Sequence, residues 1–123
     1  MKTTLIRRLQ SFAYALQGLA HLVRTQPNAR VHLLAAVLVC MVGVYVGLSR
    51  SEWLWVTVAI TLVWSAEAFN TALEQLSDAL HPKQHPGIGR AKDVAAAAVL
   101  IAAVGAAVVG MLVFTPHLAN MGR

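Results

Sequence analysis

The side chains best suited to chemistry are gathered in one stretch, E-A-F-N-T-A-L-E-Q-L-S-D, at residues 67–78. On a helix with about 100° per residue, its polar side chains fall within an arc of about 60° either side of the first glutamate. We call this set the polar stripe, and its members are Glu67, Asn70, Thr71, Glu74 and Asp78. Carboxylates can accept a proton or bind Mg²⁺, and acids in a membrane helix normally face a bundle interior, a partner or an ion. The polar stripe therefore predicts the functional site.

A lysine and an aspartate at the predicted start of a later helix could complete that site. Lys92 and Asp93 follow a glycine-containing loop, and the free N–H groups and dipole of a helix start favour an anion. Phosphoryl transfer needs a cation for the phosphates, a metal ligand and a base near the acceptor hydroxyl, and these residues with the polar stripe supply all three. Residues 87–92 do not form a Walker A loop, because G-x-x-x-x-G-K-[ST] is absent.

Simpler interpretations of these residues stay open. The acids of the polar stripe could pair with lysine and arginine and only hold helices together. His81 and His85 are four residues apart and could bind zinc. No further soft ligand lies nearby in the sequence, so ordinary loop histidines are the favoured interpretation.

The composition indicates a single integral membrane domain, residues 1–123. Hydrophobic residues make up 58% of the chain and charged residues 12%, whereas a soluble domain carries about 25% charged residues. The net charge of +5 does not indicate nucleic-acid binding, because the basic residues cluster at the ends of apolar runs without interleaved aromatics. Cys40 is the sole cysteine, so an internal disulfide is impossible.

The periodicity predicts an all-α protein with one surface helix and three membrane helices. Apolar residues recur at steps of three and four in the first element, which predicts an amphipathic helix lying on the membrane. The later apolar runs are close to the ~20 residues that cross the hydrocarbon. Ser51 is a plausible N-cap of the second run, and Pro116 is the expected end of the third. The expected bounds are about 3–25 for the surface helix and about 29–48, 52–80 and 91–115 for the membrane helices.

Small residues and charges add packing and orientation to this picture. The third membrane helix carries a ladder of small residues at every fourth position, which lets another helix approach closely: Ala98, Ala102, Ala106 and Gly110. Lysine and arginine are concentrated before the first membrane helix and between the second and third. By the positive-inside rule, the N-terminus and the second loop are cytoplasmic. The polar stripe would then end on the side where ATP is found.

Two blocks of the sequence resemble the prokaryotic diacylglycerol kinase family, which includes the undecaprenol kinases. They are E-A-F-N-T-A-L-E-Q-L-S-D and G-R-A-K-D-V-A-A-A-A-V-L, and the resemblance extends over nearly the whole chain. It implies a homotrimer in the bacterial inner membrane that phosphorylates a lipid hydroxyl with MgATP, at composite sites near the cytoplasmic face. Diacylglycerol is the expected acceptor, giving phosphatidic acid, and undecaprenol is the alternative.

The resemblance also implies a role for individual residues. Glu67 would be the general base, with Asn70 and Asp93 beside it; Lys92, Asp93 and Arg7 would contact the nucleotide; Glu74 and Gln26 would bind Mg²⁺. Gln26 stands where the family usually has a glutamate, and an amide oxygen binds Mg²⁺ more weakly than a carboxylate does.

A function of another class remains to be weighed, that of a small non-enzymatic transporter subunit. Such a protein would use the acids of the polar stripe to pass protons or cations, and would need polar groups across the whole bilayer. Residues 53–64 offer only Thr57 and Thr61. The sequence therefore favours the kinase.

Overall fold

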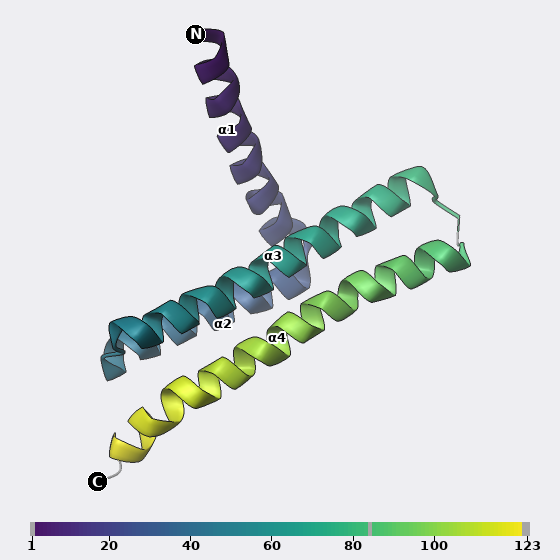
Figure 1. Cartoon of the computed structure of the whole chain (residues 1–123). Coiled ribbons are helices and arrows are strands. Elements are labelled where there is room, and N and C mark those ends of the chain that lie inside the picture. Colours follow the sequence, from purple (N-terminus) through teal and green to yellow (C-terminus); the bar gives the residue numbers. More distant parts are fainter. Residues whose placement is uncertain (1, 84, 122–123) are drawn as a thin grey trace.

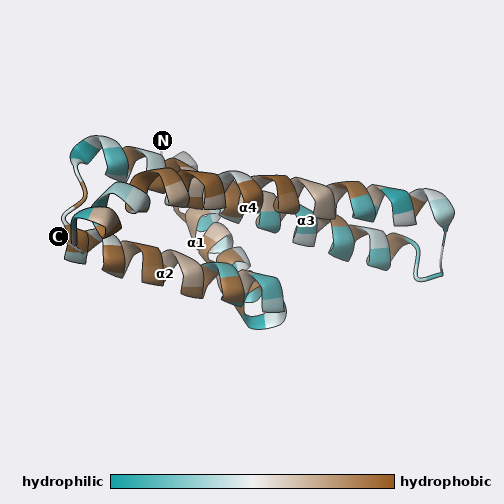
Figure 2. Ribbon diagram, turned by 90° about the horizontal axis from the view of Figure 1, so that it is seen from below, coloured by the Kyte–Doolittle hydropathy of each residue, from teal (hydrophilic) through white to brown (hydrophobic). Residues whose placement is uncertain are grey.

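The chain folds into four helices, and the secondary structure of its described residues is entirely helical (Figure 1). The computed structural model describes the backbone of residues 2–83 and 85–121, and the side chains of residues 6–83 and 85–120. The helices are α1 (Lys2–Thr25), α2 (Pro27–Val46), α3 (Arg50–Leu80) and α4 (Pro86–Met121). Helices α2, α3 and α4 are each long and apolar enough to cross a membrane, and apolar residues dominate the ribbons of α2 and of the middle of α4 (Figure 2). The expected all-α fold with three such helices is confirmed.

Helix α1 stands apart from the other three. Figure 1 shows it leaving the bundle at a steep angle, so that only its C-terminal end meets α2 and α3. Leu22 is buried at that end, whereas Phe12 and Leu16 are 72% and 67% exposed. No part of the described chain covers these apolar side chains, so the proposed place of α1 on a membrane surface stays a prediction.

Helices α3 and α4 form an antiparallel hairpin that is packed along its length, with α2 beside α3 (Figure 1). The turn from α2 into α3 depends on two glycines. Gly47 has a φ of 73°, a conformation that glycine adopts without steric cost. A Cβ on Gly43 would lie 2.9 Å from Leu48 and from Trp53. Glycine at position 43 therefore lets Leu48 and Trp53 pack directly against the backbone of α2.

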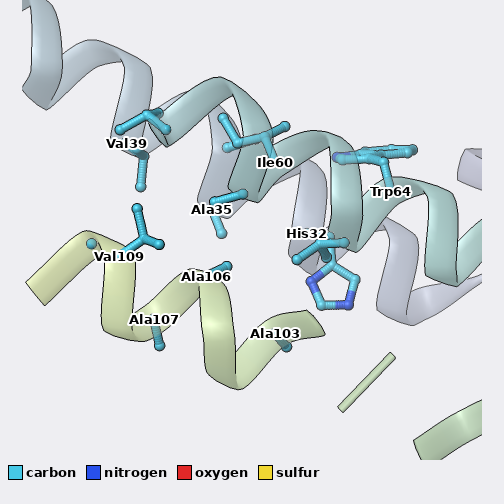
Figure 3. Close-up of a pocket in the computed structure, with 14 residues that line it drawn as sticks. His32, Ala35, Val39, Ile60, Trp64, Ala103, Ala106, Ala107 and Val109 are labelled. Atoms are coloured by element: carbon cyan, nitrogen blue, oxygen red, sulfur yellow. The ribbon is translucent and has the colours of Figure 1, made fainter. Parts of the chain in front are cut away.

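A pocket of about 280 Å³ remains between α2, α3 and α4. His32 and Trp64 lie at one end of it, and Val39 and Val109 lie at the other (Figure 3). Small residues of α4 form one wall, namely Ala103, Ala106, Ala107 and Gly110. Because these side chains are short, α4 does not fill the space that it faces.

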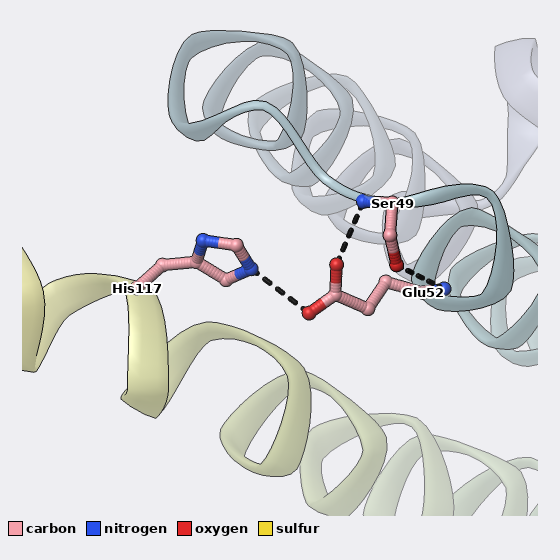
Figure 4. A network of polar contacts seen from close by, with 3 residues as sticks. All are labelled: Ser49, Glu52 and His117. Carbon is pink, nitrogen blue, oxygen red and sulfur yellow. Dashed lines mark hydrogen bonds and ion pairs between the residues drawn. The ribbon is translucent and has the colours of Figure 1, made fainter.

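The start of α3 is tied to the end of α4 by a closed set of polar contacts, which we call the outer clasp: Ser49, Glu52 and His117 (Figure 4). The Ser49 hydroxyl accepts a hydrogen bond from the Glu52 amide, and the Glu52 carboxylate accepts one from the Ser49 amide at 2.7 Å. The other oxygen of Glu52 lies 2.8 Å from Nε2 of His117. The prediction of Ser51 as N-cap is wrong, because Ser49 has the extended backbone of a cap and Ser51 lies inside the helix.

Helix α4 is longer than predicted at both ends. It begins at Pro86, since proline is favoured in the first turn, where its missing N–H costs nothing. The expected end at Pro116 is wrong, because the helix continues to Met121. The φ of Pro116 is compatible with a helix. Its ring removes one backbone hydrogen bond, but the helix ends only five residues later, so little of the helix depends on that bond. The Thr115 hydroxyl donates to the Met111 carbonyl at 2.6 Å just before it.

Candidate active site

The polar stripe lies on one side of α3 and passes from the bundle interior to its surface. Glu67, Asn70 and Thr71 are 2%, 8% and 4% exposed. Glu74 is half-buried, and Asp78 is exposed one turn further on. The shared helical face predicted from the sequence is thus confirmed for the three buried residues. The stripe connects a buried group of polar atoms to the loop end of the hairpin.

The buried part of the stripe has polar atoms without partners. Among the side chains that the structure describes, one carboxylate oxygen of Glu67, the amide oxygen of Asn70 and the hydroxyl of Thr71 have no hydrogen-bond partner. A buried polar group without a partner costs about 1–3 kcal/mol, so three such atoms within two turns of one helix need an explanation. The other end of the Asn70 amide donates to Glu74 at 3.3 Å, which leaves its oxygen free. This arrangement is typical of a site whose partners come from outside the chain.

Lys92 contacts the polar stripe at Asp78, the exposed end of the stripe. Its Nζ lies 2.7 Å from Oδ1 of Asp78, and both side chains are partly or largely open to solvent. The predicted helix-start site at this position is wrong, because α4 begins at Pro86 and the backbone N–H of Lys92 already lies inside the helix. An exposed pair is held weakly, so the Lys92 ammonium can exchange the Asp78 carboxylate for a phosphate group.

The oxygen ligands for a metal ion are few on this chain. Among residues 6–83 and 85–120, no group of three or more His, Cys, Asp and Glu side chains comes together. Glu74 offers a half-buried carboxylate, and Gln26 is the half-buried residue that precedes α2. A hydrogen bond of 2.9 Å between His21 and Gln75 joins the last part of α1 to α3 one residue beyond Glu74. An oxygen-only set of low ligand number fits Mg²⁺, which keeps several waters and binds phosphates.

Two of the predicted nucleotide-binding residues are less well placed. Arg7 is exposed on α1, and at 1.5 Å per residue it lies about 21 Å along the helix from His21. Because α1 leads away from the bundle (Figure 1), this chain does not bring its own Arg7 to the polar stripe. Asp93 is exposed beside Lys92 on α4, at the correct end of the hairpin, but it is turned by about 100° around the helix.

Two features near the stripe could not be identified from the sequence. One is the hydrogen bond between His21 and Gln75, which joins residues 54 positions apart. The other is the pocket between α2, α3 and α4, whose His32–Trp64 end lies near the stripe. Glu67 is three residues beyond Trp64, or about 4.5 Å further along α3. The small-residue ladder of α4 was the available signal, but it predicts helix packing as readily as a cavity.

The comparison with known sequences decides the family. The family described as prokaryotic diacylglycerol kinase matches residues 13–114. The chain belongs to this family. An undecaprenol kinase of Bacillus subtilis is 38% identical over 117 residues, which cover 95% of each chain. A diacylglycerol kinase of Synechocystis is 33% identical over 92% of this chain and 65% of its own length. A diacylglycerol kinase of Haemophilus influenzae is 31% identical over 82% of this chain and 86% of its own.

Family membership gives the polar stripe its chemical context. The family is one of lipid kinases, which implies ATP as co-substrate and a lipid as acceptor. The three long apolar helices agree with a protein of the membrane. The transporter alternative has no such support, so the class of reaction is phosphoryl transfer to a lipid.

Proposed function

We propose that this chain transfers the γ-phosphoryl group of MgATP to the hydroxyl of a membrane lipid at the buried end of the polar stripe. The observation that carries the proposal is the group of unpartnered polar atoms on Glu67, Asn70 and Thr71, next to an apolar pocket in a chain of this family. A lipid hydroxyl at the His32–Trp64 end of the pocket would lie close to Glu67, which is three residues beyond Trp64 on α3. It would also donate a hydrogen bond to the Glu67 carboxylate, one of the three buried groups that lack a partner.

The chemistry assigned to the chain's own residues is proton transfer and charge neutralisation. The Glu67 carboxylate accepts the proton of the lipid hydroxyl while the hydroxyl oxygen forms its bond to the γ-phosphorus, and the bond from that phosphorus to the β–γ bridging oxygen breaks to release ADP. Lys92 exchanges Asp78 for a phosphate oxygen and stabilises its charge. Asn70 orients the Glu74 carboxylate through its hydrogen bond.

The metal-binding residues in this proposal are Glu74 and Gln26. When bound there, Mg²⁺ would neutralise negative charge on the nucleotide phosphates. The two residues supply one carboxylate and one amide oxygen, so the site would bind Mg²⁺ weakly in the absence of nucleotide. We propose that the phosphates of ATP complete the ligand set.

Of the two acceptors, we favour undecaprenol, with diacylglycerol as the second candidate. The undecaprenol kinase of Bacillus subtilis matches this chain over 95% of both lengths. Diacylglycerol stays a candidate because the relatives from Synechocystis and Haemophilus influenzae are diacylglycerol kinases at 33% and 31% identity. The sequence expectation of diacylglycerol is thus ranked second here.

We further propose a homotrimer in the inner membrane of a bacterium, with the N-terminus and the α3–α4 loop in the cytoplasm. The basic residues before α2 and around that loop support the orientation. The direction of α1 supports an assembly. Because α1 leads away from its own bundle (Figure 1), the Arg7 of a neighbouring subunit could reach the polar stripe in its place. Exposed apolar side chains of α1 would then face lipid or a neighbour.

The test is phosphorylation of undecaprenol and of diacylglycerol by the purified protein in mixed micelles with MgATP. The Glu67→Gln variant should lower the activity by at least about 100-fold. Glu52→Gln makes the same chemical change at the opposite end of α3 and should keep it. Activity on one lipid that depends on Glu67 supports the proposal and names the acceptor. A folded protein that transfers phosphate to neither lipid contradicts it.

A further inference from the structure

A single residue joins α1 to α2. Helix α1 ends at Thr25 and α2 begins at Pro27, so Gln26 alone lies between them. Its backbone is extended, with a φ of −104° and a ψ of 115°, close to the conformation that the residue before a proline prefers. Rotation about these two bonds would swing α1 relative to the rest of the chain. The direction of α1 and the direction of the Gln26 side chain are therefore set at one position.

The side chain of Gln26 is not used to cap α2. A residue at this position usually accepts a hydrogen bond on its side-chain oxygen from a free N–H in the first turn of the helix that follows. Gln26 makes no such capping hydrogen bond within the described part of the chain, and Pro27 has no N–H to donate. The amide oxygen of Gln26 is therefore available to a ligand, and another group must hold the junction.

Arg30 holds this junction from the first turn of α2. Its Nε donates to the Val23 carbonyl at 3.0 Å, and its Nη2 donates to the Arg24 carbonyl at 2.6 Å. Both carbonyls lie in the last turn of α1, where helical N–H groups run out. A cation at the C-terminal end of a helix also interacts favourably with the helix dipole. One side chain thus links α2 to the end of α1 across Gln26.

Contacts with α3 give the junction a fixed place in the bundle. Leu22 and Ala29 are buried on either side of it, and His21 is hydrogen-bonded to Gln75, one residue beyond Glu74. Past these contacts α1 leads away from the bundle (Figure 1). The junction is therefore anchored near Glu74, and the angle between α1 and α2 at that anchor depends on the Arg30 side chain.

Resting on the function proposed above, we propose that Arg30 is a positioning residue of the kinase, which fixes the angle between α1 and α2 and thereby holds the Gln26 amide oxygen where it can bind Mg²⁺ beside Glu74. Arg30 itself contacts neither the metal nor the nucleotide, because its guanidinium is engaged with the two carbonyls of α1. Its removal would let Gln26 adopt other directions without removing a ligand. Groups that orient a metal ligand change metal affinity or activity by about 10- to 100-fold when they are replaced.

The first test is a magnesium titration of lipid phosphorylation by Arg30→Gln at fixed ATP. We expect the Mg²⁺ concentration for half-maximal activity to rise about tenfold, with the KM for the lipid unchanged and most of kcat recovered at saturating Mg²⁺. Arg30→Lys should give a smaller rise, because an ammonium can still donate to a carbonyl but lacks the fork of the guanidinium. Arg24→Gln removes the same charge from an exposed side chain at the same helix end and should behave like the wild type.

A double-mutant cycle with Gln26→Ala separates positioning from direct binding. If Arg30 acts through Gln26, Arg30→Gln should have little further effect on the magnesium requirement once the Gln26 side chain is gone. A loss that multiplies with that of Gln26→Ala, or that persists at saturating Mg²⁺, would show that Arg30 binds phosphate itself or only stabilises the fold. Either result overturns the inference.

Hydrogen–deuterium exchange measures the junction without any turnover. In Arg30→Gln, the backbone amides of residues 22–30 should exchange about tenfold faster than in the wild type, while those of α3 and α4 keep their rates. Arg24→Gln should change neither region. Unchanged exchange at residues 22–30 would mean that Arg30 does not hold the junction, and faster exchange along all four helices would mean that it stabilises the whole fold. Both results contradict the positioning role.

The outcomes separate this inference from the proposed function. A folded wild type that phosphorylates neither lipid contradicts the kinase proposal and removes the basis of the positioning role with it. If the wild type is active and Gln26→Ala leaves the magnesium requirement unchanged, the junction holds no metal ligand. The positioning role of Arg30 then fails alone, and the kinase proposal stands.

Discussion

Polar side chains at the start of α3 have hydrogen-bond partners within the chain, whereas three buried side-chain oxygens further along α3 do not among the described residues. At the outer clasp, Glu52 uses one oxygen for the Ser49 amide and the other for His117. Toward the other end, one oxygen of Glu67 and the nearby Asn70 and Thr71 oxygens have no hydrogen-bond partner in the described part of the chain. Both glutamates lie on the same helix, yet only the first is satisfied by the chain itself. The comparison distinguishes the Glu52 carboxylate, which stabilises the fold, from the Glu67 carboxylate, which is available to a ligand.

The largest expected effect comes from Glu67→Gln. Removing a general base typically lowers the rate by about 10²- to 10⁴-fold, and we expect kcat for lipid phosphorylation to fall by that amount. Stability should stay equal or rise, because the change replaces a buried carboxylate with a neutral amide of the same shape. Thermal unfolding and lipid phosphorylation of the same sample measure both. A large fall in melting temperature would instead give Glu67 a structural role.

The next effect separates Lys92 from its partner Asp78. Loss of a charged hydrogen bond to phosphate should lower kcat/KM for ATP by about 10- to 100-fold in Lys92→Gln. Asp78→Asn should change it by less than about threefold, because the exposed pair contributes little. ATP titrations at saturating acceptor make the comparison. Equal losses in the two variants would favour the simpler interpretation, in which the acids of the polar stripe only pair with basic residues.

A smaller effect is expected from restoring a carboxylate at position 26. Gln26→Glu should lower the Mg²⁺ concentration for half-maximal activity by up to about tenfold, because a carboxylate binds this ion more strongly than an amide. Gln17→Glu, an exposed position on α1, adds the same charge away from the junction and is the control. Magnesium titrations at fixed ATP measure the shift. An identical response of the two variants would exclude Gln26 from the metal site.

The smallest effect on activity is expected at the outer clasp. His117→Ala removes one partner of Glu52 and should lower the melting temperature by a few degrees, while kcat measured well below that temperature stays the same. A matched change in kcat would show that the two ends of the hairpin are coupled. His117→Ala is thus expected to lower stability without lowering kcat, whereas Glu67→Gln is expected to lower kcat without lowering stability.

The polar stripe was predictable because helical periodicity alone fixes which residues share a face. Element ends were harder, since Ser49 and Ser51 have the same capping chemistry and only the backbone at Ser49 decides between them. Pro116 was misjudged because proline near the end of a helix costs less than in its middle. The contact between His117 and Glu52 joins residues 65 positions apart, and the pocket needs three helices. Neither leaves a local pattern in the sequence.

The continuity of α3 and α4 has a consequence for the surrounding bilayer. With 31 and 36 residues, these helices measure about 46 and 54 Å, whereas the hydrocarbon layer is about 30 Å thick. The outer clasp joins the two rods at one end, so they would tilt together when the layer becomes thinner or thicker. The depth of Glu67 below the lipid head groups would then follow membrane thickness, and turnover in vesicles of short and long acyl chains would differ without any change in the protein.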